Sequence, residues 1–201
     1  HSFPPRRSSD LKLRHIAILG MSQGARVALQ FAIRSPESVA CLILDGPPSL
    51  DAAHRADDPA ELPYQHYRAL AQSQGVAAFR REWAVHPLVS LRTRDPCTRA
   101  LLARMIDRSP GRDLTDAPSG PAFPATRQMI ESIRAPLLLI GGALDLDSRK
   151  RFADELMSQF VQVDRAQIPD AGHLCSLDNP AAYTVALRQF LDRRAPASNH
   201  P

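Results

Sequence analysis

The stretch His15-Ile16-Ala17-Ile18-Leu19-Gly20-Met21-Ser22-Gln23-Gly24 decides the fold class of this 201-residue chain. Residues 15–20 are a short apolar run that ends at a glycine, which predicts a strand buried on both faces, as in a parallel sheet. From Gln23 to Ile33 the apolar residues recur at helical spacing, with Val27 and Phe31 four residues apart. A buried strand that turns directly into a helix is typical of an α/β unit.

The rest of the chain continues this alternation. Further buried strands are predicted over residues 39–45 and 136–140, and a weaker strand over residues 161–168. Helices are predicted over residues 148–160 and after the cap residues 178–180. Between the second and third strands, residues 49–134 contain short helical patterns and no strand pattern. The order predicts an α/β fold, in which a parallel sheet with flanking helices carries a helical insertion between its second and third strands.

Composition limits the class of protein. Hydrophobic residues make up 44% of the chain and charged residues 23%, as in ordinary globular proteins. No run of eighteen apolar residues exists, so no membrane-spanning helix is predicted. The net charge is +4, but the basic residues are interleaved with acids, which favours neither a nucleic-acid nor a membrane partner. The three cysteines lack metal-ligand spacing and are odd in number, so a reducing, cytoplasmic location is expected.

The segment Gly20-Met21-Ser22-Gln23-Gly24 matches the pattern G-x-S-x-G between a predicted strand and a predicted helix. A sharp turn there would hold Ser22 in a strained conformation, with its hydroxyl at the carboxyl end of the strand. The following helix begins at Gln23, and its N-terminus favours developing negative charge. This context favours a nucleophilic serine. The competing interpretation is an ordinary strand-to-helix turn whose glycines permit close packing.

A serine nucleophile needs a histidine base that a carboxylate orients. His173, in Asp170-Ala171-Gly172-His173, follows the fourth predicted strand and is therefore expected at the same edge of the sheet as Ser22. Asp145 follows the third strand and is the favoured acid. Two alternatives remain: Asp147, which would otherwise cap the next helix, and Asp45 at the end of the second strand.

The order Ser22, Asp145, His173 resembles that of the α/β-hydrolases. Gly141-Gly142-Ala143-Leu144-Asp145 is similar to the acid loop of that family, and Asp170-Ala171-Gly172-His173 to its histidine loop. The resemblance implies a partial α/β-hydrolase core over residues 12–48 and 135–195 and a helical cap insertion over residues 49–134. A non-native or disordered leader is expected over residues 1–11 and a disordered tail over residues 196–201.

The chain departs from the family pattern at its front. The resemblance implies further strands before residue 15, together with a loop that lends one N–H group to the oxyanion hole; the backbone N–H of Gln23 would supply the other. The chain is therefore expected to be the C-terminal part of a longer enzyme and weakly active or inactive as given. The strand from His15 to Leu19 is expected to become an exposed apolar edge.

The resemblance implies a serine hydrolase that cleaves a carboxylic ester or related acyl compound without a metal or organic cofactor. A lactonase or C–C bond hydrolase of the same fold is the alternative, and a non-catalytic ligand-binding protein is the alternative of another class. The expected partner is a small-molecule substrate, and the sequence leaves the oligomeric state open. Four arginines of the insertion would either bind a substrate carboxylate or remain solvated: Arg80, Arg81, Arg92 and Arg94.

Overall fold

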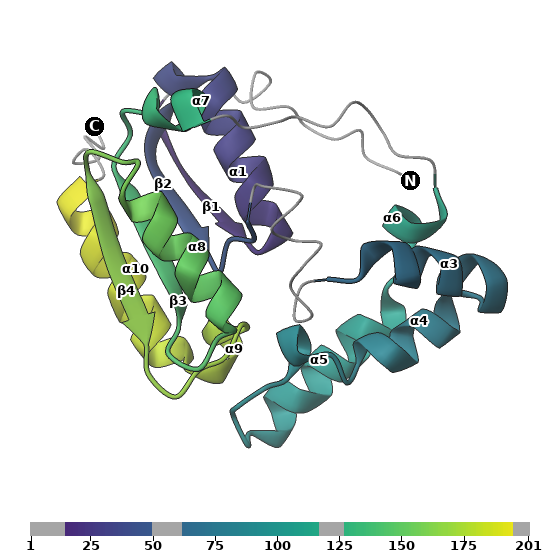
Figure 1. Cartoon of the computed structure of the whole chain (residues 1–201). Helices are drawn as coiled ribbons and strands as arrows, with labels where there is room; N and C mark the ends of the chain where they lie inside the picture. The colour runs from purple at the N-terminus through teal and green to yellow at the C-terminus, as the bar shows by residue number, and fades with distance from the viewer. Residues whose placement is uncertain (1–14, 50–61, 117–126, 195–201) are drawn as a thin grey trace, which may run out of the picture.

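The computed structural model describes residues 15–49, 62–116 and 127–194. Its four strands are β1 (Ile16–Met21), β2 (Val39–Asp45), β3 (Leu137–Gly142) and β4 (Val163–Ile168). They form one sheet in the order β1-β2-β3-β4, and every neighbouring pair is parallel (Figure 1). All four carboxyl ends therefore lie at one edge of the sheet, which places the loops that follow them side by side.

Helices cover both faces of this sheet (Figure 1). The helices that flank the sheet are α1 (Gln23–Arg34), α7 (Arg127–Glu131), α8 (Asp147–Met157), α9 (Cys175–Asp178) and α10 (Pro180–Arg194). Alternate residues of β2 point to opposite sides. Leu42 and Leu44 pack with side chains of α1, α7 and α8, whereas Cys41 and Ile43 pack with side chains of α9 and α10. The two-residue period of a strand thus divides β2 and β3 between two hydrophobic cores.

The prediction that residues 15–20 would be buried on both faces is wrong for the structure. Within the described part of the chain, β1 pairs only with β2 and forms an edge of the sheet. Ile18 packs against the core beside α1, but Ala17 is exposed and Leu19 is 44% exposed. The expectation of an apolar edge at this strand is therefore confirmed, whereas side chains of α10 pack on β2, β3 and β4.

The described residues between β2 and β3 that precede α7 form a group of helices beside the sheet, here named the helical insertion (Figure 1). Its helices are α3 (Tyr64–Gln74), α4 (Val76–Trp83), α5 (Pro96–Arg108) and α6 (Arg112–Thr115), with a 3₁₀ turn at Pro87–Val89. Tyr67, Leu70 and Phe79 lie in its own small core. Asp95 caps α5, since its carboxylate accepts a hydrogen bond from Thr98 N at 2.7 Å.

Several predicted boundaries differ from the structure. Helix α8 begins at Asp147, one residue before the predicted start, and ends at Met157, three residues before the predicted end. A short 3₁₀ turn, Pro36–Ser38, also precedes β2. The leader over 1–11 and the tail over 196–201 lie outside the described residues.

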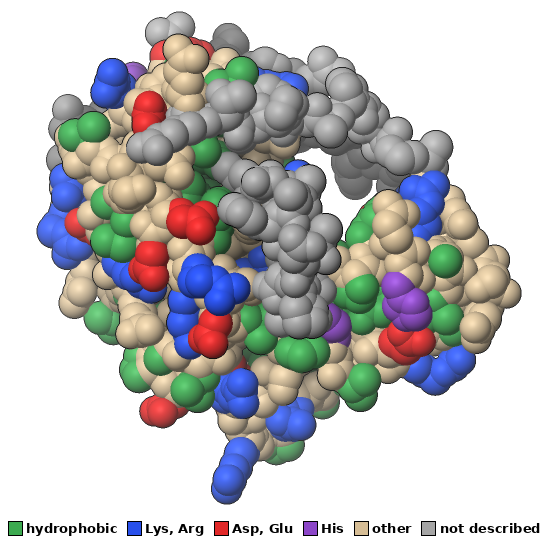
Figure 2. Space-filling model, viewed as in Figure 1, with side chains coloured by type: hydrophobic (Ala, Val, Ile, Leu, Met, Phe, Trp, Pro, Cys, Tyr) green, Lys and Arg blue, Asp and Glu red, His purple; other side chains and the backbone are tan. Residues whose placement is uncertain are grey.

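The surface carries charges of both signs. Figure 2 shows Lys and Arg side chains interspersed with Asp and Glu side chains over the sheet and its helices, without one dominant patch of either sign in this view. Among the helices that the structure describes, none combines the length and the apolar character needed to cross a membrane.

Candidate active site

Ser22 occupies a strained turn between β1 and α1. Its φ of 51° and ψ of −118° are rare for a residue with a side chain, and such a conformation costs about 1–3 kcal/mol. The strand can meet the helix this closely because residue 20 is a glycine. A Cβ at Gly20 would lie 2.3 Å from the carbonyl oxygen of Gly24 and 2.8 Å from the Cα of Ala25. Gly20 therefore permits the turn that holds Ser22.

The interpretation in which both glycines of the pattern permit close packing does not hold for Gly24. A Cβ at Gly24 would meet no described atom within 4 Å, so close packing does not require a glycine at this position. Its backbone is what a side chain at Gly20 would strike. Gln23 is the first residue of α1, so its N–H group has no partner one turn earlier in the helix.

His173 and Asp145 form a buried pair at the same edge of the sheet. His173 Nδ1 lies 3.1 Å from Asp145 Oδ2, and each side chain is only 3% exposed. The other carboxylate oxygen of Asp145 accepts a hydrogen bond from Leu146 N at 2.7 Å. With both oxygens engaged, the carboxylate is fixed in orientation, and an Nδ1–H that donates to it leaves Nε2 as the basic nitrogen of a neutral ring.

The acid loop and the histidine loop touch through their backbones. Leu144 N donates to Ala171 O at 2.8 Å, and Ala143 N donates to Ile168 O at 2.8 Å. A Cβ at Gly142 would lie 2.1 Å from the carbonyl oxygen of Gly172, so this approach requires a glycine. Gly142 thus permits the loop packing that brings Asp145 within reach of His173.

The two alternative acids lie elsewhere. The Asp147 carboxylate is 85% exposed in the first turn of α8 and pairs with Lys150 at 3.2 Å. Asp45 is 1% exposed at the end of β2, where its Oδ1 accepts a hydrogen bond from Cys175 Sγ at 3.3 Å. Neither carboxylate bonds to the imidazole, so the structure places only Asp145 against His173.

Burial makes Asp45 an unusual carboxyl group. Desolvation raises the pKa of Asp45 to about 6, against the opposing effects of the Cys175 hydrogen bond and the nearby His173 charge. Burial likewise raises the pKa of the Cys175 thiol and of the Tyr183 hydroxyl, and the Asp45 charge contributes to both shifts. Asp45 is thus the acidic member of a buried polar group that lies beside the His173–Asp145 pair.

Ser22 makes no direct hydrogen bond to His173 or Asp145 and is connected to them through the end of β2. Ser22 N donates to Asp45 O at 2.8 Å, and the next residue, Gly46, lies against the His173 ring. His173 Nε2 is buried and has no hydrogen-bond partner among the described residues, Ser22 included. Hydrogen bonds between a nucleophile and its base are often long before substrate binds.

Two cavities open at this edge. One of about 320 Å³ is bounded by Ser22 and Gln23 on the sheet side and by apolar side chains of the helical insertion. These apolar residues are Leu62, Tyr67, Phe79, Trp83, Leu88 and Leu114. The other cavity, of about 190 Å³, is bounded by Asp145 and His173 on one side and by Pro87, Ser90 and Arg92 on the other.

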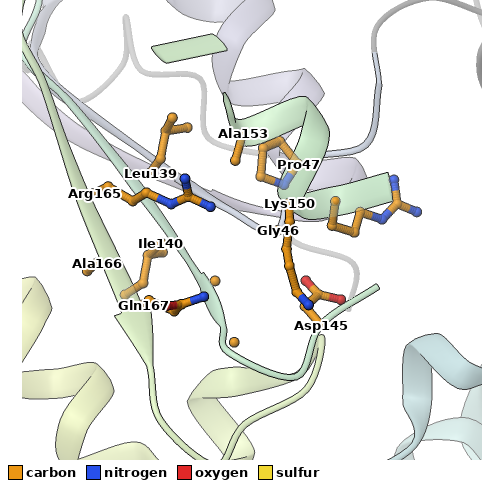
Figure 3. A pocket seen from close by; sticks show the side chains of 13 residues that line it. Gly46, Pro47, Leu139, Ile140, Asp145, Lys150, Ala153, Arg165, Ala166 and Gln167 are labelled. Atoms are coloured by element: carbon orange, nitrogen blue, oxygen red, sulfur yellow. The ribbon is translucent and has the colours of Figure 1, made fainter. Parts of the chain in front are cut away.

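A third cavity, of about 30 Å³, lies where α8 meets β3 and β4 (Figure 3). Asp145 and Lys150 border it at one end, and Arg165 and Gln167 of β4 contribute polar atoms (Figure 3). This space is about that of one water molecule, so it does not accommodate a substrate.

The arginines of the insertion divide into different environments. Arg80 is held within the insertion, because its Nε donates to Ser109 O at 2.9 Å. Arg92 borders the cavity that contains His173. Leu102 and Met105 of α5 line neither of the two larger cavities, and Met105 is 58% exposed. The described residues contain no cluster of three or more His, Cys, Asp or Glu side chains that would hold a metal ion.

Sequence reasoning missed two residues of this site. Gly46 has a positive φ of 51° and leaves room for the His173 ring. A Gly-Pro sequence after a strand predicts a turn but not a contact with a histidine. Asp178 was interpreted as part of a helix cap, whereas its carboxylate accepts backbone hydrogen bonds from Arg92, Thr93 and Gly172. No local pattern signals those contacts.

Comparison with known proteins supports this fold. The chain is 25% identical over 190 residues to the carboxylesterase YbfK of Bacillus subtilis (strain 168), covering 92% of this chain and 59% of that protein. It is 28% identical over 192 residues to a putative 2-succinyl-6-hydroxy-2,4-cyclohexadiene-1-carboxylate synthase of the same organism, covering 90% of this chain and 68% of the relative.

Among solved structures, MenH from S. aureus superposes with a TM-score of 0.75 at 18% identity, covering 90% of this chain and 70% of that one. The chain thus spans roughly three fifths to two thirds of the length of the two curated relatives. A family model described as the alpha/beta hydrolase fold matches residues 9–180. The chain belongs to the α/β-hydrolase fold family.

Proposed function

We propose that this chain carries the catalytic residues of a serine hydrolase that cleaves a carboxylic ester or a related acyl compound. The observation that carries the proposal is the buried His173–Asp145 hydrogen bond at the same sheet edge as the strained Ser22. A buried imidazole held by a carboxylate is the arrangement that activates a serine hydroxyl. The carboxylesterase relative is consistent with this chemistry.

In the proposed reaction, Ser22 Oγ attacks the carbonyl carbon while His173 Nε2 takes the hydroxyl proton. Asp145 stabilises the resulting imidazolium. The ring then gives that proton to the leaving alcohol as the tetrahedral intermediate collapses to an acyl-enzyme. Water, deprotonated by the same nitrogen, releases the acid and restores Ser22. The N–H of Gln23, at the N-terminus of α1, stabilises the negative oxygen.

The cavity beside Ser22 favours an apolar substrate group. Its walls are mainly aromatic and aliphatic, and its volume of about 320 Å³ lies in the range of small-molecule sites. Tyr67, Phe79 and Trp83 contact one another, with ring centroids 5.2 Å apart for Tyr67 and Phe79 and 6.0 Å apart for Tyr67 and Trp83. The aromatic cluster gives the pocket rigid walls that suit an apolar acyl or alcohol group.

The experiment is covalent labelling of the full-length protein with a fluorophosphonate probe, together with turnover of p-nitrophenyl esters of increasing acyl length. Labelling at Ser22 and turnover that Ser22→Ala abolishes are expected. A protein that binds ligands without catalysis would show neither. Parallel assays with lactones and with β-diketones distinguish the alternative hydrolases, because preference for either substrate class over esters would reassign the reaction.

A further inference from the structure

The carboxylate of Asp178 joins two segments that are far apart in the chain. Its Oδ1 accepts hydrogen bonds from Arg92 N at 2.6 Å and from Thr93 N at 3.0 Å. Its Oδ2 accepts one from Gly172 N at 2.8 Å. Arg92 and Thr93 belong to the helical insertion just before α5, whereas Gly172 directly precedes His173. A single side chain thus links the insertion to the histidine loop.

This link depends on an ionised carboxylate. Both oxygens act as acceptors, and a charged acceptor makes hydrogen bonds roughly twice as strong as a neutral one. An asparagine at position 178 has the same shape but presents an NH₂ group at one end, which would face either Gly172 N or the two N–H groups of the insertion. The NH₂ group of the asparagine would then face a backbone N–H group, so two hydrogen-bond donors would meet without an acceptor.

The two linked segments also form opposite walls of one cavity. Arg92 and Ser90 lie on the insertion side of the 190 Å³ cavity, and His173 and Asp145 lie on the other. Gly172 sits between them, since a Cβ there would lie 3.4 Å from Arg92 Nε and 3.5 Å from Ser90 O. Asp178 therefore fixes the spacing of the walls and the backbone that carries His173.

We propose that Asp178 is a positioning residue: through its hydrogen bonds, the position of the helical insertion against the histidine loop controls the orientation of His173. This inference rests on the proposed serine hydrolase function. Asp145 fixes the imidazole ring of His173 through the Nδ1 hydrogen bond. The hydrogen bond from Gly172 N to Asp178 fixes the backbone that directly precedes His173. If the 92–93 segment moves away, the carboxylate loses two of its three donors, and the loop that carries His173 loses its support.

The test compares Asp178→Asn with Asp192→Asn in the full chain. Asp192 is an exposed residue of α10, so its substitution makes the same change of charge on a neighbouring helix without a linked segment. Three quantities are measured at a temperature at which circular dichroism shows each variant folded: amide hydrogen exchange, the NMR signal of the His173 Cε1–H, and kcat and KM for an ester. Exchange at Gly172, Arg92 and Thr93 is expected to accelerate at least about tenfold in Asp178→Asn only, as the local protection is lost.

In the same variant the His173 signal should shift or broaden while that of His66 stays unchanged, and kcat should fall at least about tenfold with a smaller change in KM. Faster exchange with an unaltered His173 signal would overturn the proposal, leaving Asp178 as a contact of the fold alone. Unaltered exchange would overturn it as well. If the full-length protein neither hydrolyses esters nor reacts with fluorophosphonate, the proposed hydrolase function fails, and the exchange and His173 measurements still decide the positioning role. Should Asp178→Asn fail to fold, Thr93→Pro removes one of the three donors, and the same measurements apply, with exchange followed at Gly172 and Arg92 because a proline has no amide proton.

Discussion

Gly46 lies directly against the imidazole ring of His173. A Cβ built at position 46 would be 2.8 Å from His173 Cε1, 3.0 Å from its Nδ1 and 3.4 Å from Asp145 Oδ2. Gly46 also has a φ of +51°, and its N–H donates to Ile140 O at 3.0 Å. The turn after β2 therefore forms one wall of the space that the His173–Asp145 pair occupies.

Gly46→Ala should lower kcat by more than its loss of folding stability alone would cause. The new methyl group would push His173 from its place, and a misplacement of about 1 Å can cost roughly 100-fold in rate. The matched control is Gly75→Ala, because Gly75 also has a positive φ, of 82°, but a Cβ there meets no described atom within 4 Å. We expect both variants to lose stability and only Gly46→Ala to lose kcat at least about 100-fold. Equal kcat values in the two variants would contradict this contact.

In the complete enzyme, Ser22→Ala and His173→Ala should each lower kcat for ester hydrolysis by about 10⁴-fold or more, because the serine and its base act as one unit. The double variant should be hardly worse than either single one. His66→Ala is the control, since His66 pairs with Glu82 in the helical insertion. Steady-state kinetics with p-nitrophenyl esters give the measurement, and additive losses in the double variant would argue against a coupled pair.

Asp145→Asn should reduce kcat by about 10⁴-fold, because an amide no longer fixes the tautomer or stabilises the charged ring of His173. Asp147→Asn should retain activity, as that carboxylate is exposed and pairs with Lys150. Asp45→Asn should keep most of it, since Asp45 bonds to Cys175 and not to His173. Assays of the three variants side by side decide the acid, and an inactive Asp45→Asn with an active Asp145→Asn would reverse the assignment.

Asp45 should make the protein less stable as the pH rises. Its pKa is about 6 in the folded chain and 3.8 as the ordinary value, so between these values the folded state holds a proton that the unfolded state has released. The stabilisation from this group is complete below pH 4 and is lost as the pH rises through 6, with a total of up to about 3 kcal/mol.

Asp45→Asn should remove this dependence. The measurement is the free energy of unfolding in urea at pH 4.5 and pH 7.5, for wild type and variant, with Asp192→Asn as the exposed control. We expect Asp45→Asn to gain stability relative to wild type on going to pH 7.5 and the control to show no such gain. A constant difference between wild type and Asp45→Asn at both pH values would show that the carboxyl is not protonated in the fold.

The sequence by itself determined the alternation of strands and helices and the residues from which a site would form. Apolar runs and helical spacing are local properties, so the strands at Val39–Asp45 and Leu137–Gly142 and the turn at Ser22 could be predicted from neighbouring residues. Because the strands are parallel, the loops that contain Ser22, Asp145 and His173 had to share one edge of the sheet.

Tertiary structure decided what these local patterns leave open. Of the three candidate acids, Asp45, Asp145 and Asp147, only Asp145 lies against the imidazole, because the acid loop packs on the histidine loop through Gly142. The contact of Gly46 with His173 spans 127 positions, and the bonds of Asp178 to the helical insertion span 85 and 86. The spacing of residue types along a chain does not predict contacts between residues so far apart in sequence. These contacts depend on how β2, β3 and β4 pack side by side and on how the helical insertion packs against the sheet.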